Sequence, residues 1–261
     1  MIPWSTTLAA IWRPRQQALK PVQEVDPIGL EDLVGIGRQK EAMVANIQAF
    51  LQGAPFNHVL LWGARGTGKS SLVKAVLNGF GSQGLRLIEF AREDLRDLPE
   101  VVDALRTLPY RFIVFCDDFS FEEGDTSYKG LKPVLEGSIE LPPQNVMVCA
   151  TSNRRHLVSE LASDNVGTTV LQGELHYSDA VEEKISLSDR FGLWLSFYQG
   201  NQSDFLEMVD VYFKAYEGDK KVLHDAAKQF SAARASRSGR TAKQFYNAYA
   251  SVFLGKGESC G

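Results

Sequence analysis

Apolar residues follow two different patterns along the chain. In the first 200 residues they form short continuous runs rich in Val, Ile, Leu and Phe, as in strands buried on both faces of a parallel sheet. Five such runs occur, at residues 58–62, 85–90, 112–116, 146–150 and 192–197. Segments with helical spacing, such as 38–52, lie between several of them. The pattern predicts an α/β core in which a five-stranded parallel sheet is covered by helices on both faces.

Beyond residue 200 the apolar spacing becomes helical. We expect a first helix that is capped by Ser203 and a second helix over 220–235. A third helix is expected to begin at Thr241, because Thr241 and Gln244, three residues later, match a capping box. The chain therefore divides into an extended arm, an α/β core domain, a small helical domain and a tail, at residues 1–26, 27–200, 201–255 and 256–261.

The arm differs in composition from the core. It combines several prolines with Trp4 and Trp12, and its charges are mainly basic until residue 24. Two interpretations are open for this segment. It is either an extended strap that packs through its tryptophans or an arm that binds a partner or DNA.

Composition excludes several classes of protein. Of the 261 residues 44% are hydrophobic and 23% charged, which is globular rather than disordered or fibrous. The net charge of −4 argues against a general nucleic-acid coat. The three cysteines form no C-x-x-C pair, so neither a disulfide framework nor a zinc knuckle is predicted. We see no signal peptide and no apolar stretch of about 18 residues, so we expect a cytoplasmic protein without a membrane contact.

The strongest chemical signal is a phosphate-binding loop between a predicted strand and a predicted helix. It fits the pattern G-x-x-x-x-G-K-[ST] at every fixed position. Its glycines let successive N–H groups face one phosphate chain, and the helix start adds positive partial charge. We predict that it binds ATP or ADP through Gly63, Ala64, Arg65, Gly66, Thr67, Gly68, Lys69, Ser70 and Ser71.

Two residues of this loop have separate predicted roles. Lys69 would bring a full charge to the β- and γ-phosphates, which makes it a catalytic candidate as well as a binding one. Ser70 would offer its hydroxyl to Mg²⁺. Arg65 is expected to be exposed to solvent.

The strand at 112–116 ends in two acids, as a Walker B strand does. Asp117 is predicted to hold Mg²⁺ together with Ser70. Asp118 follows it at the position of a base that orients the attacking water. After a phosphate-binding loop at this distance, the two acids predict a site for Mg²⁺ and ATP.

Taken together, these motifs resemble those of the AAA+ ATPases. Residues 32–36 resemble the family's box before the phosphate loop, whose backbone meets the adenine, here at Val34, Gly35 and Ile36. Residues 149–154 are similar to the sensor 1 strand, in which Asn153 would help to orient the water. The resemblance implies a three-layer P-loop NTPase core with a parallel five-stranded sheet, followed by a small C-terminal helical lid domain.

Two arginines resemble further functional positions of these ATPases. Residues 187–192 look like the segment that presents an arginine finger, here Arg190. Arg240, at the start of the last predicted helix, resembles sensor 2. A finger that acts across an interface implies a homo-oligomer, by family resemblance a hexameric ring. More narrowly, the strings at 62–66, 152–157 and 182–192 look like a bacterial family of predicted AAA+ ATPases, domain of unknown function 815.

Each of these roles has a structural alternative. Asn153 could cap the segment that follows the strand. Arg190 could pair within its own chain with Asp189, Glu182 or Glu183. Arg154 and Arg155 lie beside sensor 1 and are further candidates for the finger role.

Asp118 departs from the family pattern, in which most active members carry Glu. Its side chain is one methylene shorter, and a base has to lie within about 2.6–3.2 Å of the water proton or act through a second water. Three alternatives follow. Hydrolysis is slow, or a shifted sheet edge compensates for the shorter side chain, or Glu122 or Glu123 assists. Two functions stay open: ATP-driven remodelling of an unidentified protein or nucleic acid, and a slow or non-hydrolysing nucleotide switch or loader.

Two further segments bear on partners. Residues 220–243 carry seven basic residues and one acid, which would suit nucleic acid, although a solvated lid face is favoured over that interpretation. Residues 163–183 are long and mixed, and a loop of this length is usually functional. We expect it to reorder with nucleotide or with assembly.

Overall fold

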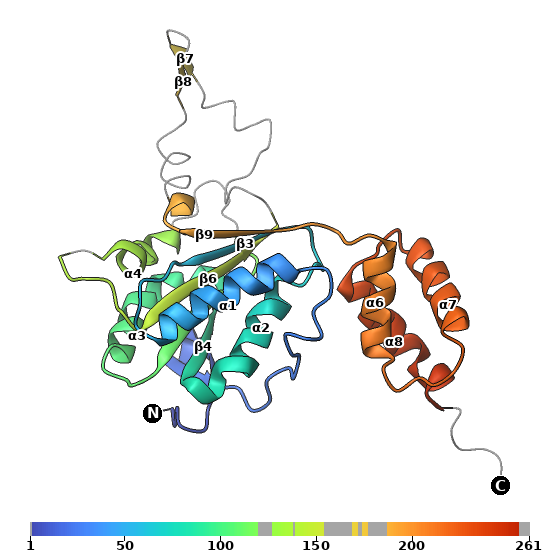
Figure 1. Ribbon diagram of the computed structural model, residues 1–261. Helices are drawn as coiled ribbons and strands as arrows, with labels where there is room; N and C mark the ends of the chain where they lie inside the picture. The colour runs from blue at the N-terminus through green and yellow to red at the C-terminus, as the bar shows by residue number, and fades with distance from the viewer. Residues whose placement is uncertain are drawn as a thin grey trace.

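The structure, a computed structural model, describes residues 2–119, 127–137, 139–153, 169–171, 174–176 and 187–255. Its centre is a seven-stranded sheet with the order β2-β1-β4-β5-β6-β3-β9 (Figure 1). All neighbours are parallel except β1 and β2. The bounds are β1 Ala9–Arg13, β2 Ala18–Pro21, β3 Val59–Gly63, β4 Leu85–Phe90, β5 Arg111–Cys116, β6 Val146–Ser152 and β9 Leu193–Phe197. The five expected strands are present, but the sheet has two more.

The two additional strands come from the N-terminal arm. β1 pairs in parallel with β4, and the chain turns at Gln17, where φ is 45°, to add β2 at the edge. Trp4 and Trp12 are buried against the core, and the Trp12 Nε1 donates to the Asp97 carboxylate at 2.9 Å. β2 is a half-exposed edge strand that ends in Pro21, which an edge position tolerates. β1 lies inside the sheet and is mostly buried, but its short apolar run lies between the prolines of the arm.

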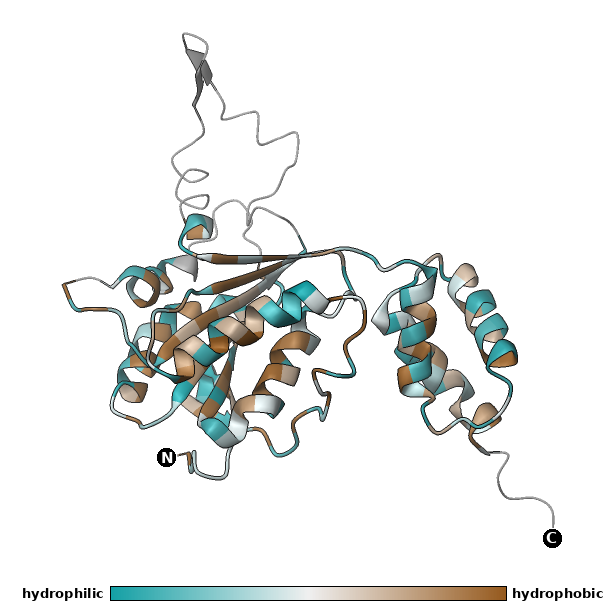
Figure 2. Cartoon of the chain, viewed as in Figure 1, coloured by the Kyte–Doolittle hydropathy of each residue, from teal (hydrophilic) through white to brown (hydrophobic). Residues whose placement is uncertain are grey.

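Side chains alternate between the two faces of the sheet and build two hydrophobic clusters. Along β3, Leu60 belongs to one cluster while Val59 and Leu61 belong to the other. Helices α1 (Gly37–Leu51) and α2 (Lys69–Phe80) cover the second cluster, on the near face in Figure 1. Helices α3 (Leu98–Leu105) and α4 (Lys132–Glu136) cover the first. Burial on both faces explains the continuous apolar runs, which Figure 2 shows as brown strands.

The helical domain has a separate core. It consists of α6 (Gln202–Tyr212), α7 (Lys220–Ala233) and α8 (Gly239–Phe253), which lie beside the sheet in Figure 1. Its interior is rich in aromatic rings: Phe205, Phe213, Phe230, Phe245, Tyr249 and Phe253. This cluster shares no residue with the two clusters of the sheet. The lid is thus a second packing unit.

The caps of two lid helices differ from the expected ones. The first is Asn201 rather than Ser203, because Asn201 accepts from the Asp204 N–H while the Asp204 carboxylate accepts from the Asn201 N–H, both at 2.9 Å. The third helix is capped by Ser238, whose hydroxyl accepts from the Thr241 N–H at 3.2 Å. Ser238 has the extended backbone that a cap requires, whereas Thr241 is already helical.

Short elements complete the described chain. Of the segment 163–183, the structure describes β7 (Thr169–Leu171) and β8 (Glu174–His176), which pair antiparallel; the rest lies outside the described residues. Four 3-10 helices occupy Pro14–Gln16, Gly81–Gln83, Arg92–Asp97 and Ser127–Gly130. Within the described part of the chain, no helix has the length and apolar character needed to cross a membrane.

Candidate functional site

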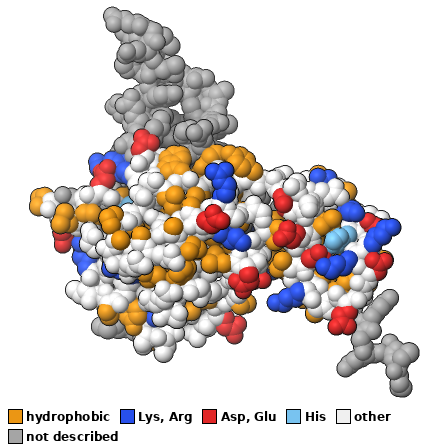
Figure 3. All heavy atoms as spheres, in the orientation of Figure 1, with side chains coloured by type: hydrophobic (Ala, Val, Ile, Leu, Met, Phe, Trp, Pro, Cys, Tyr) orange, Lys and Arg blue, Asp and Glu red, His pale blue; other side chains and the backbone are white. Residues whose placement is uncertain are grey.

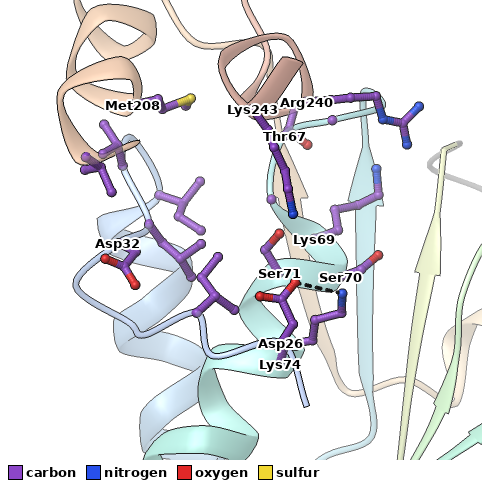
Figure 4. A pocket seen from close by; sticks show the side chains of 18 of the residues that line it. Asp26, Asp32, Thr67, Lys69, Ser70, Ser71, Lys74, Met208, Arg240 and Lys243 are labelled. Atoms are coloured by element: carbon purple, nitrogen blue, oxygen red, sulfur yellow. Dashed lines mark hydrogen bonds and ion pairs between the residues drawn. The ribbon is translucent and has the colours of Figure 1, made fainter. Parts of the chain in front are cut away.

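A cavity of about 950 Å³ lies where the carboxyl edge of the sheet meets the lid (Figure 4). The order of the strands explains its position: β6 lies between β3 and β5, so the segments that follow all three strands meet at one edge. Of the predicted nucleotide-binding residues, those in its wall are Val34, Ile36, Arg65, Gly66, Thr67, Gly68, Lys69, Ser70, Ser71 and Arg240. Gly35, Gly63 and Ala64 belong to the same segments but are not part of the wall.

The loop after β3 takes a backbone course that only glycine allows. Gly63 has φ 132°, and a Cβ there would lie 1.9 Å from the Phe197 carbonyl oxygen of β9. Gly66 and Gly68 have φ of 74° and 96°, in the left-handed region. Thr67 closes the turn by donating its hydroxyl to the Ala64 carbonyl at 2.8 Å. The glycines and this hydrogen bond therefore set the shape of the loop.

The Lys69 ammonium is held at the centre of this loop. Its Nζ donates to the carbonyl oxygens of Gly63 and Ala64, each at 2.8 Å, and to the Asn153 Oδ1 at 3.3 Å. Burial lowers the pKa of Lys69, while Asp117 and Asp118 act in the opposite direction. Partners on three sides place its charge at the phosphate end of the cavity.

Ser70 and Asp117 form the predicted metal pair. The Ser70 hydroxyl donates to Asp117 Oδ1 at 2.8 Å, and the Thr151 hydroxyl donates to the same oxygen at 2.5 Å. A hydroxyl and a carboxylate are hard oxygen donors that suit Mg²⁺, which takes few protein ligands and completes its shell with water and phosphate. The described residues contain no cluster of three or more His, Cys, Asp or Glu that would hold a metal without such a ligand.

Asp118 and Asn153 are brought together from neighbouring strands. The Asn153 amide donates to Asp118 Oδ1 at 2.6 Å, and the Asp118 N–H donates to the Thr151 hydroxyl at 3.0 Å. Asp118 has φ 54°, a conformation that few residues adopt and Asp tolerates better than most. The backbone thus directs this carboxylate toward Asn153.

Thr151 is the residue that sequence analysis missed on the core side. It lies in the wall of the cavity and its hydroxyl joins both acids, accepting from one residue and donating to the other. The available signal was its place two residues before Asn153 on the same strand: residues two apart share a face. The sensor 1 resemblance covers this position but gives it no role, because the contact depends on the pairing of β5 with β6.

The lid supplies further residues that the motifs did not mark. Lys243 lies one turn after Arg240, so both face the cavity, and Figure 4 shows Lys243 pointing into it while Arg240 extends toward the Lys69 side. Tyr212 and Tyr246 form an aromatic part of the wall with ring centroids 5.7 Å apart. Burial, with a smaller effect of nearby acids, raises the pKa of Tyr212.

The segment before α1 forms the remaining wall and is tied to α2. Lys74 pairs with Asp26 at 3.3 Å, as the dashed line in Figure 4 shows. The Asn78 amide donates to the carbonyl oxygens of Asp26 and Ile28 at 2.8 and 2.9 Å. Because α2 begins at the phosphate loop, one helix positions two walls of the cavity.

Arg190 lies apart from the residues of the cavity. Its guanidinium pairs with Glu136 of α4, and its side chain is only 16% exposed. The partner is thus Glu136 rather than Asp189; Glu182 and Glu183 lie outside the described residues, as do Arg154, Arg155, Glu122 and Glu123. Within one chain, the structure does not bring Arg190 to Lys69 and Asp118.

A family model matches residues 5–253 of this chain, nearly its whole length. That family is described as Protein of unknown function (DUF815). The chain belongs to this family. The resemblance that the motifs carry is therefore confirmed at the level of the family.

Two curated proteins share parts of the sequence. Replication factor C large subunit from Methanococcus vannielii is 23% identical over 180 residues, which are 65% of this chain and 35% of that protein. The Holliday junction branch migration complex subunit RuvB from Mycoplasmopsis pulmonis is 30% identical over 98 residues, 37% of this chain and 30% of that protein. The matched regions thus span about a third of each relative.

Solved structures of Thermotoga maritima RuvB, a Holliday junction branch migration motor, align with 84% of this chain. One has 13% identity, a TM-score of 0.47 and 71% of its own length covered; a point mutant of the same protein gives 11% and 0.49. The motifs resemble those of AAA+ ATPases, and the α/β sheet followed by a C-terminal helical domain agrees with the fold that this resemblance implies.

Proposed function

We propose that this protein binds Mg²⁺ with ATP or ADP in the cavity and hydrolyses ATP as an oligomer to remodel an unidentified partner. The observation that supports it best is the convergence of Lys69, Ser70, Asp117, Asp118 and Asn153 from three strands at one end of a cavity of about 950 Å³. When a nucleotide binds, its phosphate oxygens would replace the carbonyl oxygens of Gly63 and Ala64 as the acceptors of the Lys69 ammonium. The apolar end, with Val34, Gly35 and Ile36, would take the base.

The residues would divide the chemistry among them. Mg²⁺, held by Ser70 and Asp117, would neutralise phosphate charge. Asp118 would accept the proton of the attacking water, and Asn153 would orient that water while its amide contacts Asp118. Arg240, with Lys243 beside it, would bring positive charge from the lid.

Arg190 is proposed to act on the cavity of a neighbouring subunit. It lies outside the cavity of its own chain and is paired with Glu136, so such a role requires assembly and exchange of that ion pair. We propose a homo-oligomer in the form of a six-membered ring. A finger supplied to a site that lacks one is worth about 10³–10⁵ in rate.

A second candidate function is a slow or non-hydrolysing switch. It is supported by the Asp118 carboxylate, which is short and already accepts a hydrogen bond of 2.6 Å from Asn153. Such a protein would bind ATP tightly and wait for a partner. The two candidates differ in turnover rather than in affinity.

As to the partner, the distribution of basic residues supports a protein over a nucleic acid. Lys220 pairs with Asp210 and Lys228 with Asp225, while Arg240 and Lys243 line the cavity. On the face shown in Figure 3, basic and acidic side chains of the lid are interspersed. The run at 220–243 is therefore not one continuous basic surface.

The test is steady-state ATP turnover over a wide range of protein concentration, with Lys69→Ala as the blank. Turnover per subunit that rises with concentration supports shared sites, and mixing Arg190→Ala with Lys69→Ala subunits should then restore activity. Tight ATP binding with negligible turnover at every concentration supports the switch. Failure of ATP to bind the wild-type chain contradicts both.

A further inference from the structure

A second, smaller hollow lies behind the phosphate loop, on the other side of its contact with the lid. It has a volume of about 460 Å³ and is formed by the phosphate loop, the segment after β9 and the turn between α7 and α8. The Gly239 N–H donates to the Gly66 carbonyl at 3.0 Å, and a Cβ on Gly66 would lie 2.9 Å from the Ser238 hydroxyl. This contact separates the hollow from the large cavity.

Three arginines and no acid line this hollow. Arg65, Arg234 and Arg240 contribute the cations, and the remaining wall is made of glycine and neutral polar residues. Arg65 and Arg240 also border the large cavity, whereas Arg234, Gln199 and Gln244 border only the hollow. The hollow therefore has residues of its own.

The three guanidinium groups have no carboxylate partner among the described residues. Elsewhere in the lid, Lys220 and Lys228 are paired with acids. Arg234 lies over the Phe230 ring at 3.7 Å, a contact that holds its guanidinium without neutralising it. All three arginines are exposed, so solvent screens their mutual repulsion, but together they form a positive site that attracts an anion.

The chemistry of the wall favours a phosphate group. Guanidinium groups present planar pairs of N–H donors that match phosphate oxygens. The amides of Gln199 and Gln244 add neutral donors around the same space. Three cations with several neutral donors suit a group with more than one charge and three or more acceptor oxygens, such as a phosphate.

We propose that this hollow is a second phosphate site, separate from the site of the nucleotide phosphates and centred on Arg234. The phosphate would belong either to a free compound, such as a polyphosphate, or to a nucleic-acid backbone. The site goes beyond the proposed ATPase activity and does not depend on it. Its test therefore uses a chain whose phosphate loop is disabled.

The experiment is calorimetric titration of inorganic pyrophosphate, without Mg²⁺, into the Lys69→Ala full chain. Adding Arg234→Gln should weaken binding by at least about 10-fold, because it removes charged hydrogen bonds. Lys228→Gln is the matched control: it removes one positive charge from α7, the helix that Arg234 caps, but outside the hollow. It should change the affinity by less than about 2-fold. Equal affinities in the two variants, or no binding to the Lys69→Ala chain, would overturn the proposal.

A second variant tests the proposal independently in case Arg234→Gln does not fold. Gln244 is exposed on α8, and Gln244→Glu adds a negative charge to the wall of the hollow. This variant should abolish pyrophosphate binding, while its melting temperature should stay within a few degrees of that of the parent chain. Retained affinity in this variant contradicts the site even if Arg234→Gln fails to fold.

The source of the phosphate is distinguished by competition with a 16-nucleotide single-stranded DNA of mixed sequence. Displacement of pyrophosphate by the DNA, lost with Arg234→Gln, supports the site and identifies a nucleic-acid backbone as the source. Pyrophosphate binding that the DNA leaves unchanged supports the site and identifies a free phosphate compound.

Discussion

The core wall and the lid wall of the large cavity are built in different ways. On the core side, Lys69, Asp117 and Asp118 are fixed by hydrogen bonds to backbone and side chains of the buried strands. On the lid side, Arg240 and Lys243 are exposed and make no such bonds in the described chain. The phosphate end is thus preorganised, whereas the lid end has freedom to adjust to a ligand.

The two walls also belong to different packing units. The core wall continues into the clusters of the sheet, and the lid wall continues into an aromatic cluster of its own. A backbone hydrogen bond at 3.0 Å, from Gly239 to Gly66, joins the start of α8 to the phosphate loop. A lid attached in this way can move relative to the core without unfolding either of them, which the variants below are chosen to test.

The largest expected effect is a loss of stability that is confined to the lid and leaves the core unchanged. Phe245 is fully buried in the aromatic cluster of the lid, and Phe245→Ala should cost about 3–5 kcal/mol of its free energy of unfolding. Calorimetric melting should show the lid transition moving to lower temperature while the core transition stays. Val252→Ala, at an exposed position of the same helix, should change little. A single transition that moves as a whole would contradict independent units.

Acid should destabilise the core through His58, whereas Phe245→Ala destabilises the lid. Burial lowers the pKa of His58 from 6.5 to about 4, and the Val148 N–H donates to its Nδ1 at 3.0 Å, which requires a neutral ring. The unfolded chain therefore binds more protons than the folded chain between pH 6.5 and 4. The core should lose up to about 3 kcal/mol of its free energy of unfolding as the pH falls through this window.

The measurement is denaturant unfolding of the core at several pH values between 7 and 4. His58→Gln removes the titrating ring and should flatten the curve over this range. A slope that is unchanged in His58→Gln would assign the acid sensitivity to other groups.

An intermediate effect is expected at the junction of the two acids. Thr151→Val removes the hydroxyl that contacts both Asp117 and Asp118. It should lower the free energy of unfolding by about 1–2 kcal/mol. Turnover should fall while the affinity for ADP stays within about 3-fold, because the hydroxyl positions the acids and the lysine still binds phosphate. Thr151→Ser restores the hydroxyl and should restore turnover; failure of that rescue would assign the loss to altered packing.

The smallest effect is expected on the lid wall. Lys243 is exposed, so Lys243→Gln should weaken ADP binding by about 3-fold at low salt and less at high salt, where charges are screened. Titration of ADP at two salt concentrations measures this difference, with Lys228→Gln as the control for loss of a lid charge. A loss comparable to that of Lys69→Ala would mean that the two walls contribute alike.

Local chemistry made much of this molecule predictable. The five central strands were recognisable because strands buried on both faces are continuously apolar, and the phosphate loop because its turn requires glycine at fixed spacing. Asp117 and Asp118 could be named because they lie where an apolar strand ends, and Asn153 because residues 149–154 resemble the sensor 1 strand. These features depend on a few neighbouring residues, so the sequence carries them directly.

Other features depended on contacts between distant segments. β2 escaped notice because an edge strand buries only part of its surface and leaves no continuous apolar run. β1 is mostly buried, but its short apolar run was read as part of the proline-rich arm. Thr151 became a site residue only through the pairing of β6 with β5, and Lys243 only through the placement of the lid over the cavity. The prediction of Ser203 as the cap was wrong, because Asn201 makes the reciprocal hydrogen bonds with Asp204 that begin the helix.

The fold class and the phosphate-binding pattern could be read from short stretches of chain, because glycine conformation, burial and charge act locally. The partner of Arg190 within its own chain depended on tertiary contacts. Its motif predicted a finger, which stays a prediction; Glu136 follows a different strand and reaches Arg190 only when α4 packs beside the segment before β9. An ion pair between segments 54 residues apart leaves no local signal, since both charges are equally compatible with solvent until the chain folds.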